Sequence, residues 1–351
     1  MKEEQRKDVG VVVSYFDTPH VLTWEVTRAC QLHCRHCRAR AIPRRDAGEL
    51  SLEDMIPVLD DLAGNFSRPP ILVLTGGDPL ERPDLDDIIA EAVSRHIITA
   101  IAPSVTPKLT DEVVARWKSL GVHSVSLSLD GVDAPTHDKF RGVRGTFDRT
   151  MELADTIVRE GLALQINTSI SQQTVSQIPA MASLVRFLQV TSWELFFVIP
   201  TGRARIMDAL SAAQIERVLQ WLVEFAPKES FRITTVGAPQ WSRVLHQNNP
   251  ASAIRTVARE ARGFAFINHL GEVFPSGYLP VSAGNVRQTP FSELYRRSEL
   301  FEMLRDPSRF EGACGACDYR DSCGGSRARA YAVTGNLAAS DPGCPLAEFD
   351  S

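Results

Sequence analysis

The 351-residue chain contains no run of about 18 consecutive apolar residues, so no segment is a candidate for a membrane-spanning helix. Its first residues, MKEEQRKDVGVVVSYFD, include a short apolar run but lack the arrangement of a secretory signal peptide. An excess of basic residues is also missing, because the formal net charge is −5. These absences predict a cytoplasmic protein that spans no membrane and binds no nucleic acid.

Cysteine is absent between residues 37 and 314, although the chain has seven cysteines. They form one group of three and one group of four: Cys30, Cys34 and Cys37, and Cys314, Cys317, Cys323 and Cys344. The cytoplasm keeps thiols reduced, so disulfides are not expected. This partition at opposite ends of the chain predicts two separate metal sites. The first group has one thiol fewer than the usual four.

Short apolar runs alternate with amphipathic stretches from residue 21 to about residue 226. The runs that predict strands are 21–27, 71–76, 96–102, 123–130, 162–170 and 192–199. The stretches that predict helices are 51–64, 84–95, 110–120, 146–160, 175–188 and 211–226. Near-continuous apolar strands separated by helices indicate a parallel sheet covered by helices. Six such units predict an α/β fold, a partial (β/α)6 barrel of the TIM type, with functional residues after the strands.

The pattern changes after about residue 230. Residues 231–236 and parts of 263–281 read as short strands, 291–304 reads as a helix, and 310–351 is rich in glycine and cysteine with little periodicity. Such a segment is typical of a unit held by a metal. We therefore expect an N-terminal extension (1–20), a barrel (21–228) and a C-terminal metal-binding domain (229–351).

The stretch TRACQLHCRHCRARA (27–41) places three cysteines in C-x3-C-x2-C spacing directly after the first predicted strand. Three thiolates can bind three corners of an iron–sulfur cubane and leave the fourth iron open to another ligand. The alternative is a zinc site that borrows His33 or His36 as its fourth ligand, although C-x2-C pairs are commoner for zinc.

This motif, after the first strand of a repeating βα pattern, resembles that of the radical S-adenosylmethionine (radical SAM) enzymes. LTGGDP (74–79), after the second strand, is similar to the family's glycine-rich loop, which contacts the methionine amino group. The resemblance implies that four residues bind the cofactor: Gly76, Gly77, Asp78 and Pro79. Glu is commoner than Asp in the family at residue 78. The same residues also read as an ordinary strand-to-helix loop, and both interpretations can hold together.

SLSLDGVDAPTHDKFRG (126–142) is similar to a segment of the family subgroup with a cysteine-rich C-terminal extension. The resemblance implies that Ser128 contacts the ribose and that Arg141 binds the methionine carboxylate, for which the planar guanidinium is suited. It also implies that His36 lies against adenine and that Asn167 lines the nucleoside site. Taken alone, Arg141 reads as a surface residue, and a solvated His36 is an equal alternative to a contact with adenine.

The resemblance further implies the chemistry of the first cysteine group. Cys30, Cys34 and Cys37 would hold a 4Fe–4S cluster whose open iron is chelated by S-adenosylmethionine. The reduced cluster then cleaves the sulfonium to methionine and a 5′-deoxyadenosyl radical, which abstracts a substrate hydrogen. The protein's part is to position these cofactors and to exclude water.

The four C-terminal cysteines follow a C-x2-C-x5-C pattern completed by Cys344. Four thiolates can saturate a cubane, or they can hold a structural zinc ion. The spacing resembles the auxiliary-cluster module of the SPASM and twitch subgroups. The full SPASM pattern needs further cysteines where this chain has Ser276 and Ser326–Arg327. We therefore expect a twitch domain with one auxiliary 4Fe–4S cluster, and two 4Fe–4S clusters in the whole chain.

HCRARA (36–41) and CGGSRARA (323–330) resemble segments of the radical SAM proteins of alternative haem and haem d1 biosynthesis, which modify tetrapyrrole side chains. Arginine suits propionate carboxylates. The basic residues that prompt this substrate are Arg28, Arg35, Arg38, Arg40, Arg44, Arg45, Arg327 and Arg329. Such a run also fits a solvated face, or a surface that attracts an acidic electron donor of the flavodoxin or ferredoxin type.

Three other functions remain open. A peptide maturase would normally carry a peptide-clasping domain before the barrel, where this chain has about 20 residues. A small metabolite such as a sugar nucleotide is a second possibility, and an iron–sulfur sensor, which needs no methionine-binding loop, is a third. Three tyrosines are candidate hydrogen or proton donors, although each also reads as a packing residue: Tyr278, Tyr319 and Tyr331.

Overall fold

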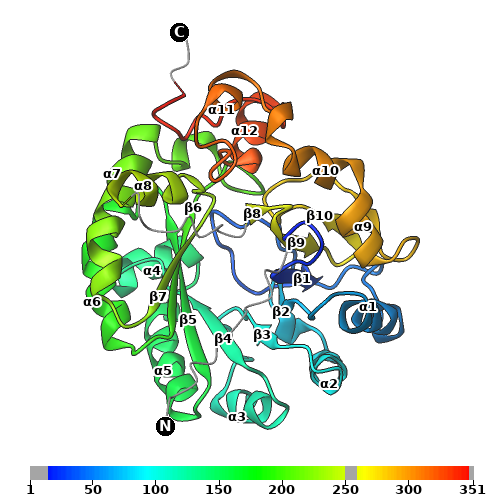
Figure 1. The fold of residues 1–351 in the computed structure, drawn as a ribbon. Coiled ribbons are helices and arrows are strands. Elements are labelled where there is room, and N and C mark those ends of the chain that lie inside the picture. Colours follow the sequence, from blue (N-terminus) through cyan, green and yellow to red (C-terminus); the bar gives the residue numbers. More distant parts are fainter. Residues whose placement is uncertain (1–14, 250–258, 348–351) are drawn as a thin grey trace, which may run out of the picture.

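The strands of the protein form one curved sheet. The computed structural model describes residues 15–249 and 259–347. The sheet order is β11-β10-β9-β1-β2-β3-β4-β5-β6-β7, and β8 pairs with β9. Every neighbouring pair from β9 through β7 is parallel, whereas β10 is antiparallel to β9 and β11. No pairing among the described strands joins β7 to the opposite edge, so the barrel is open (Figure 1).

The strands are β1 (Val21–Thr27), β2 (Ile71–Gly76), β3 (Thr99–Ile101), β4 (Ser124–Ser128), β5 (Ala163–Ile170), β6 (Ser192–Phe197), β7 (Arg232–Val236), β8 (Arg259–Glu260), β9 (Gly263–Ile267), β10 (Glu272–Phe274) and β11 (Gly284–Asn285). The helices of the barrel are α1 (Leu52–Gly64), α2 (Leu85–Ser94), α3 (Asp111–Ser119), α4 (Ala134–Arg141), α5 (Thr146–Arg159), α6 (Ile178–Phe187) and α7 (Ala212–Phe225). Those that follow are α8 (Gln240–Asn248), α9 (Phe291–Arg297), α10 (Glu299–Arg305), α11 (Gly312–Ala316) and α12 (Arg327–Thr334).

The two faces of the sheet differ in polarity, and β1 shows why. Leu22, Trp24 and Val26 are buried, whereas Thr23, between them, is partly exposed. Successive side chains of a strand point to opposite faces, so the apolar set packs outward beneath the helices that surround the sheet (Figure 1). The inner face carries Glu25 on β1 and Glu194 on β6. The core thus lies between strands and helices, and polar groups line the inside.

The predicted partial barrel is confirmed, and β1 and β2 have the predicted bounds. The sheet also crosses the expected boundary at residues 228 and 229. β7 continues it beside β6, and β9 extends it beside β1. The division into two domains stays a prediction, because both parts contribute strands to this one sheet.

Several helices differ from the expected pattern. The helix predicted at 291–304 is divided at Ser298 into α9 and α10. α4 was not predicted, because only His137 and Phe140 are buried among its residues and its apolar periodicity is weak. α8, α11 and α12 were also missed. Within residues 15–249 and 259–347, no helix has the length and apolar character needed to cross a membrane.

Candidate active site

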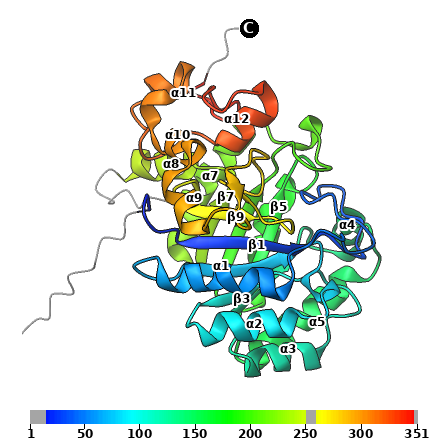
Figure 2. The same cartoon turned by 90° about the vertical axis from the view of Figure 1, so that its right-hand side faces the viewer.

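The loop that follows β1, here called the cluster loop (residues 28–42), carries the three-cysteine motif. Its two ends are joined, because Cys30 N donates to Ile42 O at 2.9 Å and Ile42 N donates to Arg28 O at 3.0 Å. Its middle is held against α4, where Arg35 N donates to Phe140 O at 3.3 Å (Figure 2). The motif therefore lies at the carboxyl end of a barrel strand, where this architecture places its chemistry.

Each of the three thiols receives a hydrogen-bond donor. Leu32 N lies 3.3 Å from Cys30 Sγ, Ala41 N lies 3.4 Å from Cys37 Sγ, and Arg141 Nη1 lies 3.8 Å from Cys34 Sγ. Burial raises the pKa of Cys30 to about 11 and also raises the pKa of Cys34. Both thiols are therefore protonated at neutral pH in the absence of a metal, and iron binding must displace their protons.

The three thiols of the described loop are not gathered around the position of a single metal ion. No three or more His, Cys, Asp or Glu side chains in the described part of the chain converge closely enough to hold one metal ion. Thiolates that share one zinc ion lie closer together than thiolates on different irons of a cubane. His36, one of the two candidate zinc ligands, instead stacks on Phe140 with ring centroids 4.1 Å apart. Burial, reinforced by Arg141 and Arg203, lowers the His36 pKa to about 4, so the ring is neutral at pH 7.

The glycine-rich loop after β2 is bonded directly to the cluster loop. Gly77 N donates to Thr27 O at 2.8 Å, and Asp78 N donates to Ala29 O at 2.7 Å. A Cβ on Gly76 would lie 2.3 Å from Thr27 O, and a Cβ on Gly77 would lie 2.3 Å from Ala29 O. Only residues without a side chain allow the two loops to approach this closely.

Asp78 is fully buried and its carboxylate is already engaged. It accepts hydrogen bonds from the Thr106 hydroxyl at 2.8 Å and from Leu80 N at 3.2 Å, and so caps the short 3-10 helix η1 (Pro79–Glu81). Burial raises the Asp78 pKa to about 6. These contacts agree with the strand-to-helix loop interpretation, and the predicted contact of Asp78 with a methionine ammonium stays a prediction.

The residues expected to bind the rest of the cofactor lie on neighbouring strands or beside the cluster loop. Ser128 and Asn167 face each other in the register of β4 and β5. Arg141 forms an ion pair with Asp130, which is buried just after β4 and accepts from Ser169 N at 2.7 Å. Burial alone would raise the Asp130 pKa, but Arg141, His36, His137 and the hydrogen bond from Ser169 N together leave the pKa below its usual value. Arg141 is therefore part of the site and is not a solvated surface residue.

The arginines of the cluster loop and of the residues just after it have more partners than their sequence suggests. Arg28 Nη2 lies 3.7 Å from Asp46 Oδ2. Arg38 Nη2 lies 2.7 Å from Glu25 Oε2, and Arg45 Nε lies 2.7 Å from Glu49 Oε2. The acids that neutralise them lie outside the basic run or at its end. Arg35, Arg40 and Arg44 remain exposed.

Glu25 joins the cluster loop to the C-terminal part of the chain. Besides Arg38, it contacts His269 Nδ1 at 2.9 Å, and His269 belongs to the turn between β9 and β10. Burial alone would raise the Glu25 pKa, but Arg38 and His269 together lower it below its usual value. Tyr278 follows β10 and is close enough to Arg38 and Glu194 to respond to their charges, and burial raises its pKa to about 12. Of the three candidate tyrosines, Tyr278 is therefore the one placed on the inner side of the sheet.

The four C-terminal cysteines all line one cavity. Backbone N–H groups point at their sulfurs: Asp341 N lies 3.3 Å from Cys314 Sγ, Tyr319 N lies 3.4 Å from Cys317 Sγ and Gly325 N lies 3.5 Å from Cys323 Sγ. Burial raises the Cys323 pKa to about 12 and also raises that of Cys344. This donor set fits a saturated iron–sulfur cluster, whose sulfur ligands are commonly stabilised by such N–H groups.

Arg327 and Arg329 lie beside this second cysteine group, and protein groups engage both guanidinium groups. Arg327 donates to Cys314 Sγ at 3.4 Å and to Ala339 O at 2.7 Å. Arg329 pairs with the fully buried Asp341 at 3.1 Å. Their guanidinium groups join parts of the C-terminal segment. The arginines near the cluster loop therefore remain the candidates for binding a substrate carboxylate.

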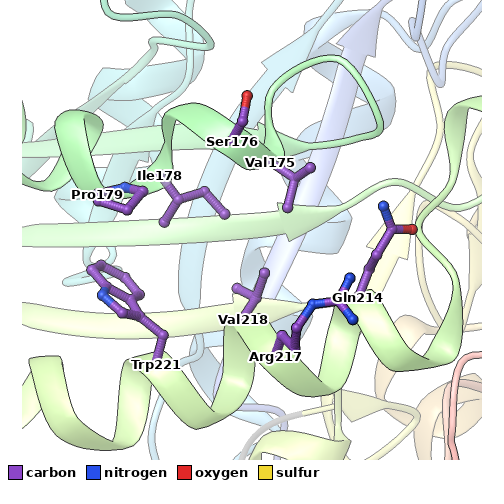
Figure 3. A pocket seen from close by; sticks show the side chains of 8 residues that line it. All are labelled: Val175, Ser176, Ile178, Pro179, Gln214, Arg217, Val218 and Trp221. Atoms are coloured by element: carbon purple, nitrogen blue, oxygen red, sulfur yellow. The ribbon is translucent and has the colours of Figure 1, made fainter.

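A separate hollow of about 300 Å³ lies on the outer surface between α6 and α7 (Figure 3). Val218 and Trp221 of α7 face Ile178 and Pro179 across it. Its lining contains no cysteine and none of the residues described above.

Sequence reasoning missed several side chains around the site, among them Glu25, Glu194, His269 and Arg203. Glu25 could have been recognised from the sequence. It is an acid within the apolar run VLTWEVT, and because successive side chains of a strand point to opposite faces, it is expected to face the barrel interior. His269 had none, since its partner is distant in sequence. Arg203 could have been noted because it follows Gly202 just beyond a predicted strand.

The residues from 24 to 185 match the model of the radical SAM superfamily. The chain is 36% identical over 345 residues to the AdoMet-dependent heme synthase of Methanosarcina barkeri, which covers 95% of this chain and 98% of the relative. The chain belongs to the radical SAM superfamily. It is therefore an enzyme, and its family implies a 4Fe–4S cluster and S-adenosylmethionine as cofactors. The recognition made from the two sequence motifs is confirmed.

Two further comparisons extend this result. The chain is 30% identical over 351 residues to the pre-heme d1 synthase of Dinoroseobacter shibae, which covers 93% of this chain and 86% of the relative. The structure of SuiB from Streptococcus suis, bound to its precursor peptide SuiA, superposes with a TM-score of 0.74 at 16% identity, over 95% of this chain and 76% of SuiB. At that identity the superposition shows the fold alone.

Proposed function

We propose that this radical SAM enzyme acts on a tetrapyrrole that carries carboxylate side chains, and that it uses one auxiliary 4Fe–4S cluster. The observation that carries the substrate is the similarity over 98% of the length of a haem synthase, together with that to a pre-heme d1 synthase. The peptide-bound SuiB shares only the fold, so a peptide substrate is the second candidate.

In the first site, Cys30, Cys34 and Cys37 would hold the reactive cluster. When bound, it supplies the electron that cleaves S-adenosylmethionine into methionine and a hydrogen-abstracting 5′-deoxyadenosyl radical. The chain contributes position: the close contacts of Gly76 with Thr27, at the end of β1, and of Gly77 with Ala29 of the cluster loop set the distance between the two loops. Buried Asp130 and the largely buried Arg141 balance each other's charge beside this site.

In the second site, Cys314, Cys317, Cys323 and Cys344 would saturate the auxiliary cluster. The support is their common cavity and the N–H groups directed at their sulfurs. No further cysteine is present for another cluster, because all seven are assigned. An acidic donor such as flavodoxin or a ferredoxin would deliver electrons, and the exposed arginines Arg35, Arg40 and Arg44 offer the complementary charge.

Metal analysis tests the two clusters. Anaerobic reconstitution should load about eight irons per chain, four for each cubane. About four irons, or stoichiometric zinc in the C-terminal site, would overturn the auxiliary cluster.

Porphyrin titration tests the substrate. Iron-coproporphyrin III should bind the reconstituted protein and shift its Soret band, with saturation at micromolar concentration. An unchanged Soret band at high protein concentration would reject the tetrapyrrole, and a candidate precursor peptide would be the next ligand to titrate.

A further inference from the structure

Arg203 lies in the loop after β6, and this loop rests directly on the cluster loop. Arg203 N donates to Cys37 O at 3.0 Å, and Arg40 Nε donates to Gly202 O at 3.1 Å. A Cβ on Gly202 would lie 2.4 Å from Cys37 O. The backbone of Arg203 is therefore held beside the third cysteine of the open site.

The side chain of Arg203 is unusual in its lack of partners. Its Nε and Nη2 are buried and make no hydrogen bond to any described residue. Among the described residues, six other arginines also have a buried, unpartnered nitrogen, but each engages another nitrogen of the same group in a hydrogen bond or ion pair: Arg28, Arg141, Arg243, Arg262, Arg305 and Arg329. No such contact with another described residue involves the Arg203 guanidinium.

The two unpartnered nitrogens lie on one edge of the guanidinium. Nε–H and Nη2–H point in nearly the same direction and form the fork that binds both oxygens of a carboxylate. A lone buried N–H costs free energy, and a buried charge without a counter-charge costs more. Arg203 thus presents an unfilled carboxylate-binding geometry beside the site.

Two acids, Asp130 and Asp208, act with Arg203 on the neighbouring His36, and both already have partners. Asp130 is paired with Arg141 and accepts from Ser169 N. Asp208 accepts from Arg205 N at 2.9 Å and lies 3.7 Å from Arg205 Nε. Both carboxylates therefore have partners other than Arg203.

We propose that Arg203 binds a carboxylate at the face of the three-cysteine site. This carboxylate comes from one of two sources, the methionine part of S-adenosylmethionine or a propionate of the porphyrin substrate. The second source rests on the proposed function, and the first requires only the family. Arg203 would act separately from Arg141, whose guanidinium is engaged by Asp130 and Cys34.

Binding by the reconstituted holoprotein tests the proposal with paired ligands. One pair is S-adenosylmethionine and its decarboxylated analogue, measured by anaerobic equilibrium dialysis. The other is iron-coproporphyrin III and its tetramethyl ester, measured by Soret titration. Arg203→Gln should weaken the carboxylate member of one pair by about tenfold or more, because a charge-assisted bidentate contact is lost. The carboxylate-free member of that pair should bind as before.

Two variants serve as references. Arg203→Lys keeps the charge without the fork and should fall between wild type and Arg203→Gln. Arg205→Gln removes an exposed arginine of the same loop and should bind all four ligands like wild type. Iron content shows whether each variant still holds its clusters, and Arg203→Lys carries the comparison if Arg203→Gln loses iron.

Two results would overturn the proposal: unchanged affinity for both carboxylate ligands, or an equal loss for both members of a pair. A wrong substrate assignment would give a different result in these binding measurements. If wild type binds neither porphyrin, the tetrapyrrole is rejected, and the S-adenosylmethionine pair alone decides the role of Arg203.

Discussion

The two cysteine groups differ in where their surroundings come from. The three thiols after β1 lie among loops contributed by β2, β4 and β6, which are distant in sequence. The four C-terminal thiols line a cavity built mainly from residues 313–347, and Arg243 is the exception. A site assembled from several strand ends can combine ligands for a cofactor and a substrate. A site assembled from one segment mainly secures its own metal.

Removing one thiol from each site should have unequal consequences, and this is the largest expected effect. Cys34→Ala should abolish the release of 5′-deoxyadenosine in the presence of dithionite and S-adenosylmethionine, because the open cluster loses a ligand. Cys323→Ala should lose about four irons but still release 5′-deoxyadenosine without substrate. Chromatography of the products and iron analysis measure both. Continued release by Cys34→Ala would reject the assignment of the open site.

The contact between loops can be tested with a matched pair of glycines. Gly77→Ala places a Cβ 2.3 Å from Ala29 O, so the cluster loop must move and iron loading of the first site should fall severalfold. Gly64→Ala, in α1, meets no atom within 4 Å and should be neutral or stabilising by about 1 kcal/mol. Iron analysis and thermal unfolding distinguish the two variants. Equal loading in both would show that the close approach is unimportant.

The buried pair Arg38–Glu25 predicts a pH-dependent change in stability. Arg38→Met should lower the free energy of unfolding by about 3 kcal/mol at pH 7, because it leaves a buried carboxylate short of its counter-charge. Since the folded-state pKa of Glu25 is lowered, the pair stabilises the protein above the unfolded pKa near 4.5. The stabilisation is lost as pH falls through the lower folded-state pKa. Denaturant unfolding at several pH values measures the difference.

A pH-independent difference between wild type and Arg38→Met would contradict this account. The difference in unfolding free energy between wild type and Arg38→Met should instead decrease steadily as the pH falls, because protonated Glu25 carries no charge for the guanidinium to neutralise. Arg35→Met is the control, since Arg35 is exposed and forms no ion pair within the described residues.

The smallest expected effect concerns the auxiliary site. Arg327 donates to Cys314 Sγ, so Arg327→Leu removes a hydrogen bond and a positive charge beside that sulfur. The reduction potential of the auxiliary cluster should become more negative by about 40 mV, the equivalent of about 1 kcal/mol for one electron. EPR-monitored redox titration measures it, and the potential of the other cluster serves as the internal control. A shift of both potentials together would indicate a general loss of structure.

The sequence predicted those structural features that are determined by residues close together in the chain, such as strand bounds and the spacing of metal ligands. The predicted bounds of β1 and β2 were confirmed because a strand that is buried on its outer face appears in the sequence as an apolar run. The cysteine spacing identified the family because the geometry of the ligands restricts that spacing. Contacts between distant segments were not predicted. The pairing of β9 with β1, the approach of His269 to Glu25 and the placement of Arg203 beside Cys37 each join residues far apart in sequence.

Other misses have local causes. α4 buries two side chains and has little apolar periodicity, so it resembled a loop. The arginine run of the cluster loop appeared unneutralised because Glu25 precedes it, while Asp46 and Glu49 lie at or beyond its end. The same reasoning placed Arg327 and Arg329 near a substrate, whereas their acceptors lie in the C-terminal segment and at Gly237 O.

The two proposed clusters differ in that one site is open to S-adenosylmethionine and the other is closed. The most direct test is EPR of the dithionite-reduced, reconstituted protein before and after S-adenosylmethionine is added. In wild type, one of the two 4Fe–4S signals should change when S-adenosylmethionine is added. The change should persist in Cys323→Ala and disappear in Cys34→Ala. A change confined to the signal that Cys323→Ala removes would contradict the assignment of the two sites.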